Sequence, residues 1–167
     1  MKILTKNAMI KLASTHTAVA AEADDDGDVE VVVGEDGEPE SETETFDMDT
    51  EGVLRVSDEK IEIEYFETEL TGMDGACTNI SFDRANPGLV TMLRTGSVET
   101  ALVFEEGRRN VCAYTTDAMA FEVTIRTWDL CNEMTENGGK LTLDYSLELH
   151  GITADHTKIE IDVTVVK

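Results

Sequence analysis

Hydrophobic and polar residues alternate along most of the chain after residue 43. The clearest case is residues 140–150, KLTLDYSLELH, in which every second residue is Leu or Tyr. The same period of two recurs in the stretches IEIEYFE (61–67), TNISF (78–82), GLVTMLRT (88–95), ETALVFEEG (99–107), NVCAYTT (110–116), AMAFEVTIRTW (118–128) and KIEIDVTVV (158–166). Because the side chains of a strand point alternately to two faces, each stretch is predicted to be a β-strand with one buried face.

The connections between these stretches predict how the strands are arranged. They are short and rich in turn residues, as at 107–110 (GRRN) and 137–139 (NGG), which is typical of antiparallel hairpins. Residues 7–17, NAMIKLASTHT, alternate as well and add a strand near the N-terminus, whereas only residues 129–136, DLCNEMTE, could form a helical turn. We therefore predict an all-β, antiparallel up-and-down barrel of about 8–10 strands, because closure leaves no exposed strand edges.

Charge is distributed unevenly along this single predicted domain of residues 1–167. Thirteen basic residues face 36 acidic ones, and no Lys or Arg occurs between residues 22 and 51. A dense run of like charge resists compaction, so we predict an acidic, flexible insertion at about residues 20–43. Within it, VEVVV (29–33) predicts a short strand and GEDGEPESETE (34–44) a loop. Asp24, Asp26 and Asp28 match only half of an EF-hand pattern, which favours a solvated loop over a calcium site.

The formal charge of −23 also restricts the partners. Nucleic-acid binding requires clustered Lys and Arg, and anionic membrane surfaces would repel the chain, so neither partner is expected. Cys77, Cys112 and Cys131 lack the spacing of a thiolate zinc site, and we expect them to be reduced. Polar residues interrupt the N-terminal apolar run that a signal peptide would need, which predicts a cytoplasmic protein.

No constellation in the sequence predicts catalysis, and we expect neither an enzyme nor a bound cofactor or metal. The three histidines, His16, His150 and His156, lie outside any nucleophile motif, and the last two are placed at the final hairpin turn. The acidic residues assigned to strands fall on the solvent-exposed faces, so no desolvated general acid is expected. The stretch ELTGMDGA (69–76) lies between two strands and lacks a Lys, which makes it a hairpin turn rather than a phosphate loop.

Four stretches carry a resemblance to a known family. They are YFETELTGMDGACTNISF (65–82), MLRTGSVETALVFEEGRR (92–109), YTTDAMAFEVTIRT (114–127) and ENGGKLTLDYSLEL (136–149). In their order and spacing they resemble the uncharacterised, calycin-like β-barrel proteins of the YwiB type, found mainly in Firmicutes. The resemblance implies a lipocalin-like barrel and no known activity. By analogy with calycins, Arg126 would pack across Trp128 as a latch at one barrel end, or else Arg94 or Arg126 would contact an anion.

The barrel pattern leads to a hypothesis about function. We expect a non-enzymatic barrel that binds a small apolar or amphipathic molecule in its interior or mouth. The candidate ligand-binding residues are Ile63, Tyr65, Met73, Phe121, Val123, Tyr145, Arg94 and Arg126. The alternative is a filled barrel that acts as a protein-interaction or scaffold module through the acidic loop or a barrel end. For a protein partner or a homodimer, Phe66 and Val166 on otherwise polar faces would seed a small contact.

Overall fold

The protein is described by a computed structural model of residues 1–167. The structure describes residues 2–19, 21–23, 29–31, 34–37, 41–69, 73–116, 118–149 and 152–166. Its twelve strands are β1 (Leu4–Val19), β2 (Ala21–Ala23), β3 (Val29–Val31), β4 (Ser41–Val56), β5 (Lys60–Phe66), β6 (Cys77–Asp83), β7 (Asn86–Thr95), β8 (Glu99–Glu105), β9 (Arg109–Thr115), β10 (Ala120–Asn132), β11 (Gly138–Leu149) and β12 (Ile152–Val165). This part of the chain contains no helix long and apolar enough to cross a membrane.

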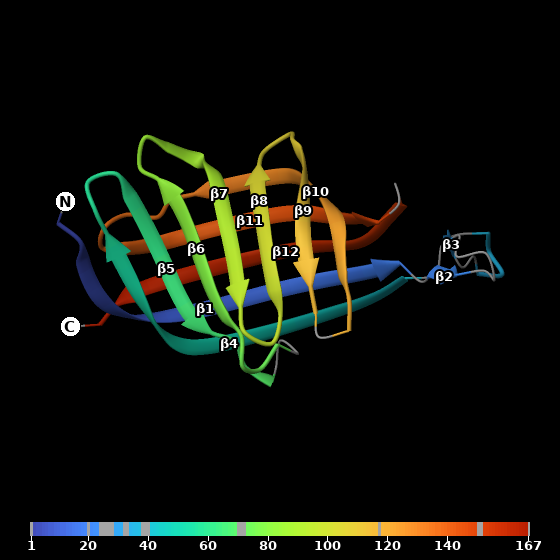
Figure 1. The fold of residues 1–167 in the computed structure, drawn as a ribbon, viewed down its shortest axis with the longest axis horizontal. Coiled ribbons are helices and arrows are strands. Elements are labelled where there is room, and N and C mark those ends of the chain that lie inside the picture. Colours follow the sequence, from blue (N-terminus) through green and yellow to red (C-terminus); the bar gives the residue numbers. More distant parts are fainter. Residues whose placement is uncertain are drawn as a thin grey trace.

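Ten of these strands form one closed antiparallel barrel. Its order is β1, β12, β11, β10, β9, β8, β7, β6, β5 and β4, and β4 pairs again with β1. Strands β2 and β3 form a separate two-stranded hairpin between β1 and β4 in the sequence. In Figure 1 the shorter strands β5 to β9 lie across the long strands β1, β4, β11 and β12. The predicted antiparallel, up-and-down barrel is therefore confirmed.

Two local predictions are corrected by the strand boundaries. Residues 129–136 form no helical turn, because β10 continues to Asn132 and includes the first four of them. The loop predicted over residues 34–44 ends earlier, since β4 begins at Ser41 and pairs with β1 from that residue on. Strong like charge did not prevent a strand here, because exposed acidic side chains project from one two-stranded ladder into solvent. The predicted Asp24–Asp28 loop lies outside the described residues.

The barrel core follows the predicted alternation. In β5, Ile61, Ile63 and Tyr65 are buried while their neighbours Glu62 and Glu64 are half-buried on the outer face. The same alternation in the other strands fills the interior with large side chains, each of which contributes about 1.5–3 kcal/mol when fully buried. The largest fully buried side chains are Tyr65, Phe104, Ile10, Leu54, Ile63, Ile80, Met92, Ile125, Leu141, Leu143, Ile161 and Val90.

Two loops pack against each other at one end of the barrel. The β5–β6 connection contains the end of the ELTGMDGA stretch, and Gly75 has the positive φ, 89°, that a turn glycine favours. The β7–β8 turn lies against it, and Ser97 Oγ donates a hydrogen bond to the Asp74 carbonyl oxygen at 3.0 Å. Gly96 has a φ of 107°, and a Cβ added there would lie 2.5 Å from the Gly75 carbonyl oxygen. The close approach of the two loops therefore depends on Gly96.

We expect Gly96→Ala to lower the free energy of unfolding by about 2–3 kcal/mol, because it combines a left-handed backbone with a steric conflict. Gly107→Ala is the matched control, since Gly107 also has a positive φ but has no atom within 4 Å of the added Cβ. The control should lose only about 1 kcal/mol. Urea unfolding measures both, and equal losses would show that the two loops do not constrain each other.

The barrel strands β1 and β4 pair with each other along their whole length. Val19 of β1 pairs with Ser41 of β4, so the chain leaves and re-enters the barrel at adjacent positions. Figure 1 shows the β2–β3 hairpin beyond the end of the barrel. The described residues of this segment, 21–23, 29–31 and 34–37, therefore contribute no strand to the barrel ladder.

We expect deletion of residues 23–40 to leave a single cooperative unfolding transition. Residues 20–22 would then join Val19 to Ser41 as a three-residue hairpin loop, a length common in antiparallel pairs. Urea unfolding followed by tryptophan fluorescence and by far-UV circular dichroism checks this, and the two curves should coincide. Loss of the cooperative transition would mean that the deleted residues support the barrel.

Candidate functional site

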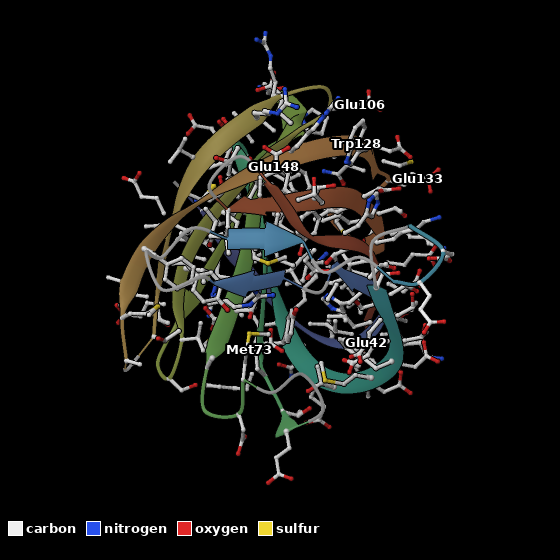
Figure 2. All side chains as sticks on the ribbon, turned by 90° about the vertical axis from the view of Figure 1, so that its right-hand side faces the viewer. Glu42, Met73, Glu106, Trp128, Glu133 and Glu148 are labelled. Atoms are coloured by element: carbon white, nitrogen blue, oxygen red, sulfur yellow. The ribbon has the colours of Figure 1, made fainter. Side chains whose placement is uncertain are left out.

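A cavity of about 330 Å³ lies inside the barrel, toward the end at which β1 pairs with β4 at Val19 and Ser41. Figure 2 looks onto this end and labels Met73 beside the opening. Nearly every barrel strand contributes to the wall. The residues lining the cavity are Leu12, Ser14, His16, Phe46, Tyr65, Glu67, Met73, Arg94, Val98, Leu102, Tyr114, Tyr145, Leu147, Asp155, Thr157 and Ile159.

One side of the cavity holds a buried carboxylate. Glu67 follows β5 and is 4% exposed, and its backbone N–H donates to the Ala76 carbonyl oxygen at 2.8 Å. Thr78 Oγ1 donates to Glu67 Oε1 at 2.5 Å. Arg94 Nε lies 3.5 Å from the same Oε1, so a guanidinium balances the charge of the carboxylate. Glu67 Oε2 has no hydrogen-bond partner among the described residues.

Tyr65 places a hydroxyl beside this carboxylate. The side chain is 1% exposed, and burial, followed by the negative charge of Glu67, raises its pKa far above the ordinary value. The phenol therefore stays protonated at neutral pH and can donate a hydrogen bond. Thr78 directs its own proton to Glu67, and no described residue bonds the Tyr65 hydroxyl with acceptable geometry.

Four polar side chains of β1 and β12 form a second hydrogen-bonded network in the cavity wall. Ser14 Oγ lies 2.9 Å from His16 Nε2, Thr157 Oγ1 lies 2.9 Å from His16 Nδ1, and Asp155 Oδ2 lies 3.4 Å from both Thr157 Oγ1 and His16 Nδ1. Thr157 Oγ1 donates to Asp155 Oδ2, and one consistent arrangement has a proton on His16 Nδ1 that is donated to Thr157 Oγ1. Nε2 then accepts the Ser14 hydroxyl proton.

The order serine, histidine and carboxylate is also that of a hydrolase triad. Acyl transfer further needs N–H donors directed at the developing oxyanion. Ser14 lies within β1. It pairs with Phe46 of β4 on one side and with Ile159 of β12 on the other. Those ladders use the backbone amides around Ser14. We therefore interpret these four side chains as a hydrogen-bond network that holds His16 and Asp155 in the cavity wall.

Unpartnered polar atoms are concentrated at this cavity. Six buried side-chain polar atoms in the described part of the chain lack a hydrogen-bond partner. Four of them belong to residues that line the cavity, namely Tyr65 Oη, Glu67 Oε2, Arg94 Nε and Asp155 Oδ1. Each such group costs about 1–3 kcal/mol when it is left unsatisfied. Polar atoms held in this way are available to a molecule inside the cavity.

The structure places the predicted ligand-binding residues in three environments. Tyr65, Met73, Arg94 and Tyr145 line the cavity. Ile63 and Val123 belong to the packed core, and Phe121 stacks on the cavity residue Tyr114 with ring centroids 5.1 Å apart. Arg126 lies on the outer face of β10, with its guanidinium carbon 3.6 Å from the centre of the Trp128 ring, which is the predicted stacking.

Trp128 joins a polar network on the outer wall of the barrel. Its Nε1 donates to Ser146 Oγ at 2.7 Å, and His156 Nε2 lies 2.5 Å from Asp144 Oδ1. The sequence placed His156 at a turn, and that prediction is corrected, because the residue lies within β12 opposite Ser146. His150 lies outside the described residues.

The sequence analysis missed the four polar residues that define the site: Ser14, His16, Glu67 and Asp155. The acids expected on the solvent-exposed faces were Glu62, Glu64, Asp144, Glu148, Glu160 and Asp162, which are all partly exposed. Glu67 was given no role, and its side chain is 1% exposed. The alternation of inward and outward positions contained the signal that these residues face the interior. Glu67 continues the inward series of Ile61, Ile63 and Tyr65, and Ser14 and His16 continue that of Ile10 and Leu12. Polarity suggested an exterior position, although the period of two placed these residues inside.

Metal and thiol chemistry find no support at this site. The described residues contain no group of three or more His, Cys, Asp or Glu side chains that could hold a metal ion. All three cysteines are free thiols, and burial raises the pKa of Cys112 above its ordinary value. The cavity therefore offers hydrogen bonds, charge and apolar surface.

Comparisons with known proteins show to which family the chain belongs. A family model described as a domain of unknown function, DUF1934, matches residues 32–161. The chain belongs to this family. The crystal structure of the ywiB protein from Bacillus subtilis is similar, with a TM-score of 0.69 and 16% identity over 98% of this chain and 94% of that one. The predicted YwiB-type family is thus confirmed, and no curated protein sequence matches the chain.

Two hydroxyl deletions test the geometry of this DUF1934 member's site. Thr78→Val removes a partnered hydroxyl and leaves buried Glu67 with fewer donors, so we expect a loss of about 1–3 kcal/mol in unfolding free energy. Tyr65→Phe removes an unpartnered hydroxyl, so its unfolding free energy should stay equal to that of the wild type or rise. Urea unfolding at neutral pH measures both. A comparable loss in Tyr65→Phe would mean that its hydroxyl has a partner in the unliganded protein.

Proposed function

We propose that this protein binds a small amphipathic molecule inside the barrel and does not transform it. The observation that carries the proposal is the cavity itself, in which apolar surface and unpartnered polar atoms occur together. Its volume of about 330 Å³ lies within the range of roughly 300–1,000 Å³ that is common for small-molecule sites.

The apolar part of the wall would hold the body of the ligand. Leu12, Phe46, Leu102, Leu147 and Ile159 line the cavity from five strands. Apolar contact contributes about 25 cal/mol for each Å² removed from water, and its strength does not depend on orientation. These residues thus favour an apolar body without specifying which one.

The polar part of the wall would orient the ligand. Tyr65, Glu67, Arg94 and Asp155 each keep one buried polar atom unpartnered, at an expected cost to the unliganded protein. A ligand with a complementary polar end removes that cost when it binds. A few fixed polar groups in an apolar pocket are the usual means by which such sites select their ligands.

The alternative, a filled barrel that acts through its surface, requires an interior without room for a ligand. The cavity weighs against it. Phe66 and Val166 are 68% and 55% exposed and line one groove on the outer face, which agrees with their expected exposure. Nothing in the described residues indicates what would cover that groove.

Native mass spectrometry of protein purified from its own host tests the proposal directly. We expect a reproducible added mass that is lost under denaturing conditions. Only the unliganded mass, together with no binding of 1-octanol or other small amphipaths by calorimetry, would contradict the proposed function.

A cavity-filling variant locates the binding. Leu147→Trp places a large ring in the cavity from β11, so we expect it to abolish the added mass or reduce 1-octanol affinity at least tenfold. Val111→Trp is the matched control, because Val111 is 68% exposed on the outer face of β9. Isothermal titration calorimetry measures both variants. Equal affinities in Leu147→Trp and the control would place the ligand outside the barrel.

A further inference from the structure

We propose that the polar end of the ligand is an amine, bound as its ammonium ion, so that the preferred ligand is an amphipathic amine. The proposal rests on the proposed function and deepens it. It follows from two properties of the cavity, the sign of its formal charge and the kind of polar atom that is left without a partner.

The formal charges of the cavity add up to a negative or neutral site. Glu67 and Asp155 each contribute one negative charge, and Arg94 contributes one positive charge. His16 adds a positive charge only when it is protonated. The sum is therefore −1 or 0 and never positive. An ammonium group improves this balance, whereas a carboxylate or phosphate ligand would add charge of the same sign.

Three of the four unpartnered cavity atoms can accept a hydrogen bond, and the fourth, Arg94 Nε, is a donor that lies 3.5 Å from Glu67 Oε1. Glu67 Oε2 and Asp155 Oδ1 are carboxylate oxygens, which accept hydrogen bonds and cannot donate them when ionised. The Tyr65 hydroxyl can do either. An ammonium ion carries three donors and no acceptor, so it complements this set of atoms. A carboxylate ligand has only acceptors and would leave both cavity oxygens unserved.

Arg94 is the one group in the cavity that would favour an anion, and the structure limits that role. Its Nε lies 3.5 Å from Glu67 Oε1, and the Glu67 side chain is 1% exposed. Glu67, which also accepts a hydrogen bond from Thr78, is thus a counter-ion for Arg94 that is already in place. An anion at Arg94 would also lie beside this buried carboxylate, at a large electrostatic cost.

The overall charge acts in the same direction. With 36 acidic and 13 basic residues, the surface attracts cations and repels anions as they approach. This long-range effect is screened at physiological salt, where the Debye length is about 8 Å. It therefore aids the encounter, and the selection for an amine depends on the buried carboxylates.

Three probes that differ only in the polar end test the inference: octylamine, 1-octanol and octanoate. Isothermal titration calorimetry at pH 7 and 0.15 M salt should show octylamine binding at least tenfold more tightly than 1-octanol, and octanoate binding more weakly than 1-octanol. Equal or tighter binding of octanoate would overturn the amine inference while leaving the proposed function intact. Failure of all three to bind would overturn both.

Variants distinguish the cavity from the acidic surface. Glu67→Gln and Asp155→Asn each remove one cavity carboxylate at almost constant size, and each should weaken octylamine about tenfold or more while changing 1-octanol less than threefold. Asp155→Asn keeps the test usable if Glu67→Gln fails to fold, because the Asp155 side chain is 30% exposed.

Glu106→Gln is the matched control for these variants. Glu106 is exposed and lies in the β8–β9 turn, and Figure 2 labels it at the side of the barrel opposite Met73. The Glu106→Gln substitution removes one negative charge from the surface and should leave the octylamine affinity unchanged. If Glu106→Gln weakens octylamine as much as the cavity variants do, the amine binds to the acidic surface and the inference is wrong.

Discussion

Each strand of this barrel places every second side chain in the interior, and this alternation continues where the apolar residues end. In β1, Ile10 and Leu12 pack in the core, and the next two inward positions hold Ser14 and His16. In β12, Ile159 and Ile161 are preceded by inward Thr157 and Asp155. Closure of the barrel brings these polar residues to the same end. The period of two thus produces both the packed core and the polar cavity.

The same constraint explains what could be predicted from sequence. Strand positions, antiparallel order and closure follow from alternation and short turns, and the buried face of β5 was predicted residue by residue. In β11, Ser146 is buried although the alternation placed it on the exposed face. The start of β4 was obscured because its acidic composition resembles a solvated loop. The cavity was only half predicted, with Tyr65, Met73, Arg94 and Tyr145 found and Glu67 missed. Sequence pattern gives the face on which a side chain lies, whereas the partners across a barrel depend on register and closure.

A barrel with polar residues inside gives up stability at that end. Thr78 and Arg94 partly satisfy Glu67, and Thr157 and His16 partly satisfy Asp155, yet each carboxylate keeps one unpartnered oxygen. Apolar residues of similar size would pack there without that cost. Replacing such a group as a whole would then be stabilising, whereas removing a single partner, as in Thr78→Val, leaves the other partner buried and unserved. The proposed ligand would supply the partners that these groups lack.

In the proposed complex, the charges of the cavity and those of the protein surface would act at different stages of ligand binding. The acidic residues on the outer strands and turns are separated from the interior by the barrel wall and are screened by salt, so they change the rate of encounter. Glu67 is buried and Asp155 is partly exposed in the cavity wall, so their interaction with a ligand is screened less than that of the surface charges. Raising the salt concentration should therefore reduce the association rate of a cationic ligand more than it raises the dissociation rate. A ligand held only by the acidic surface would lose affinity through both rates.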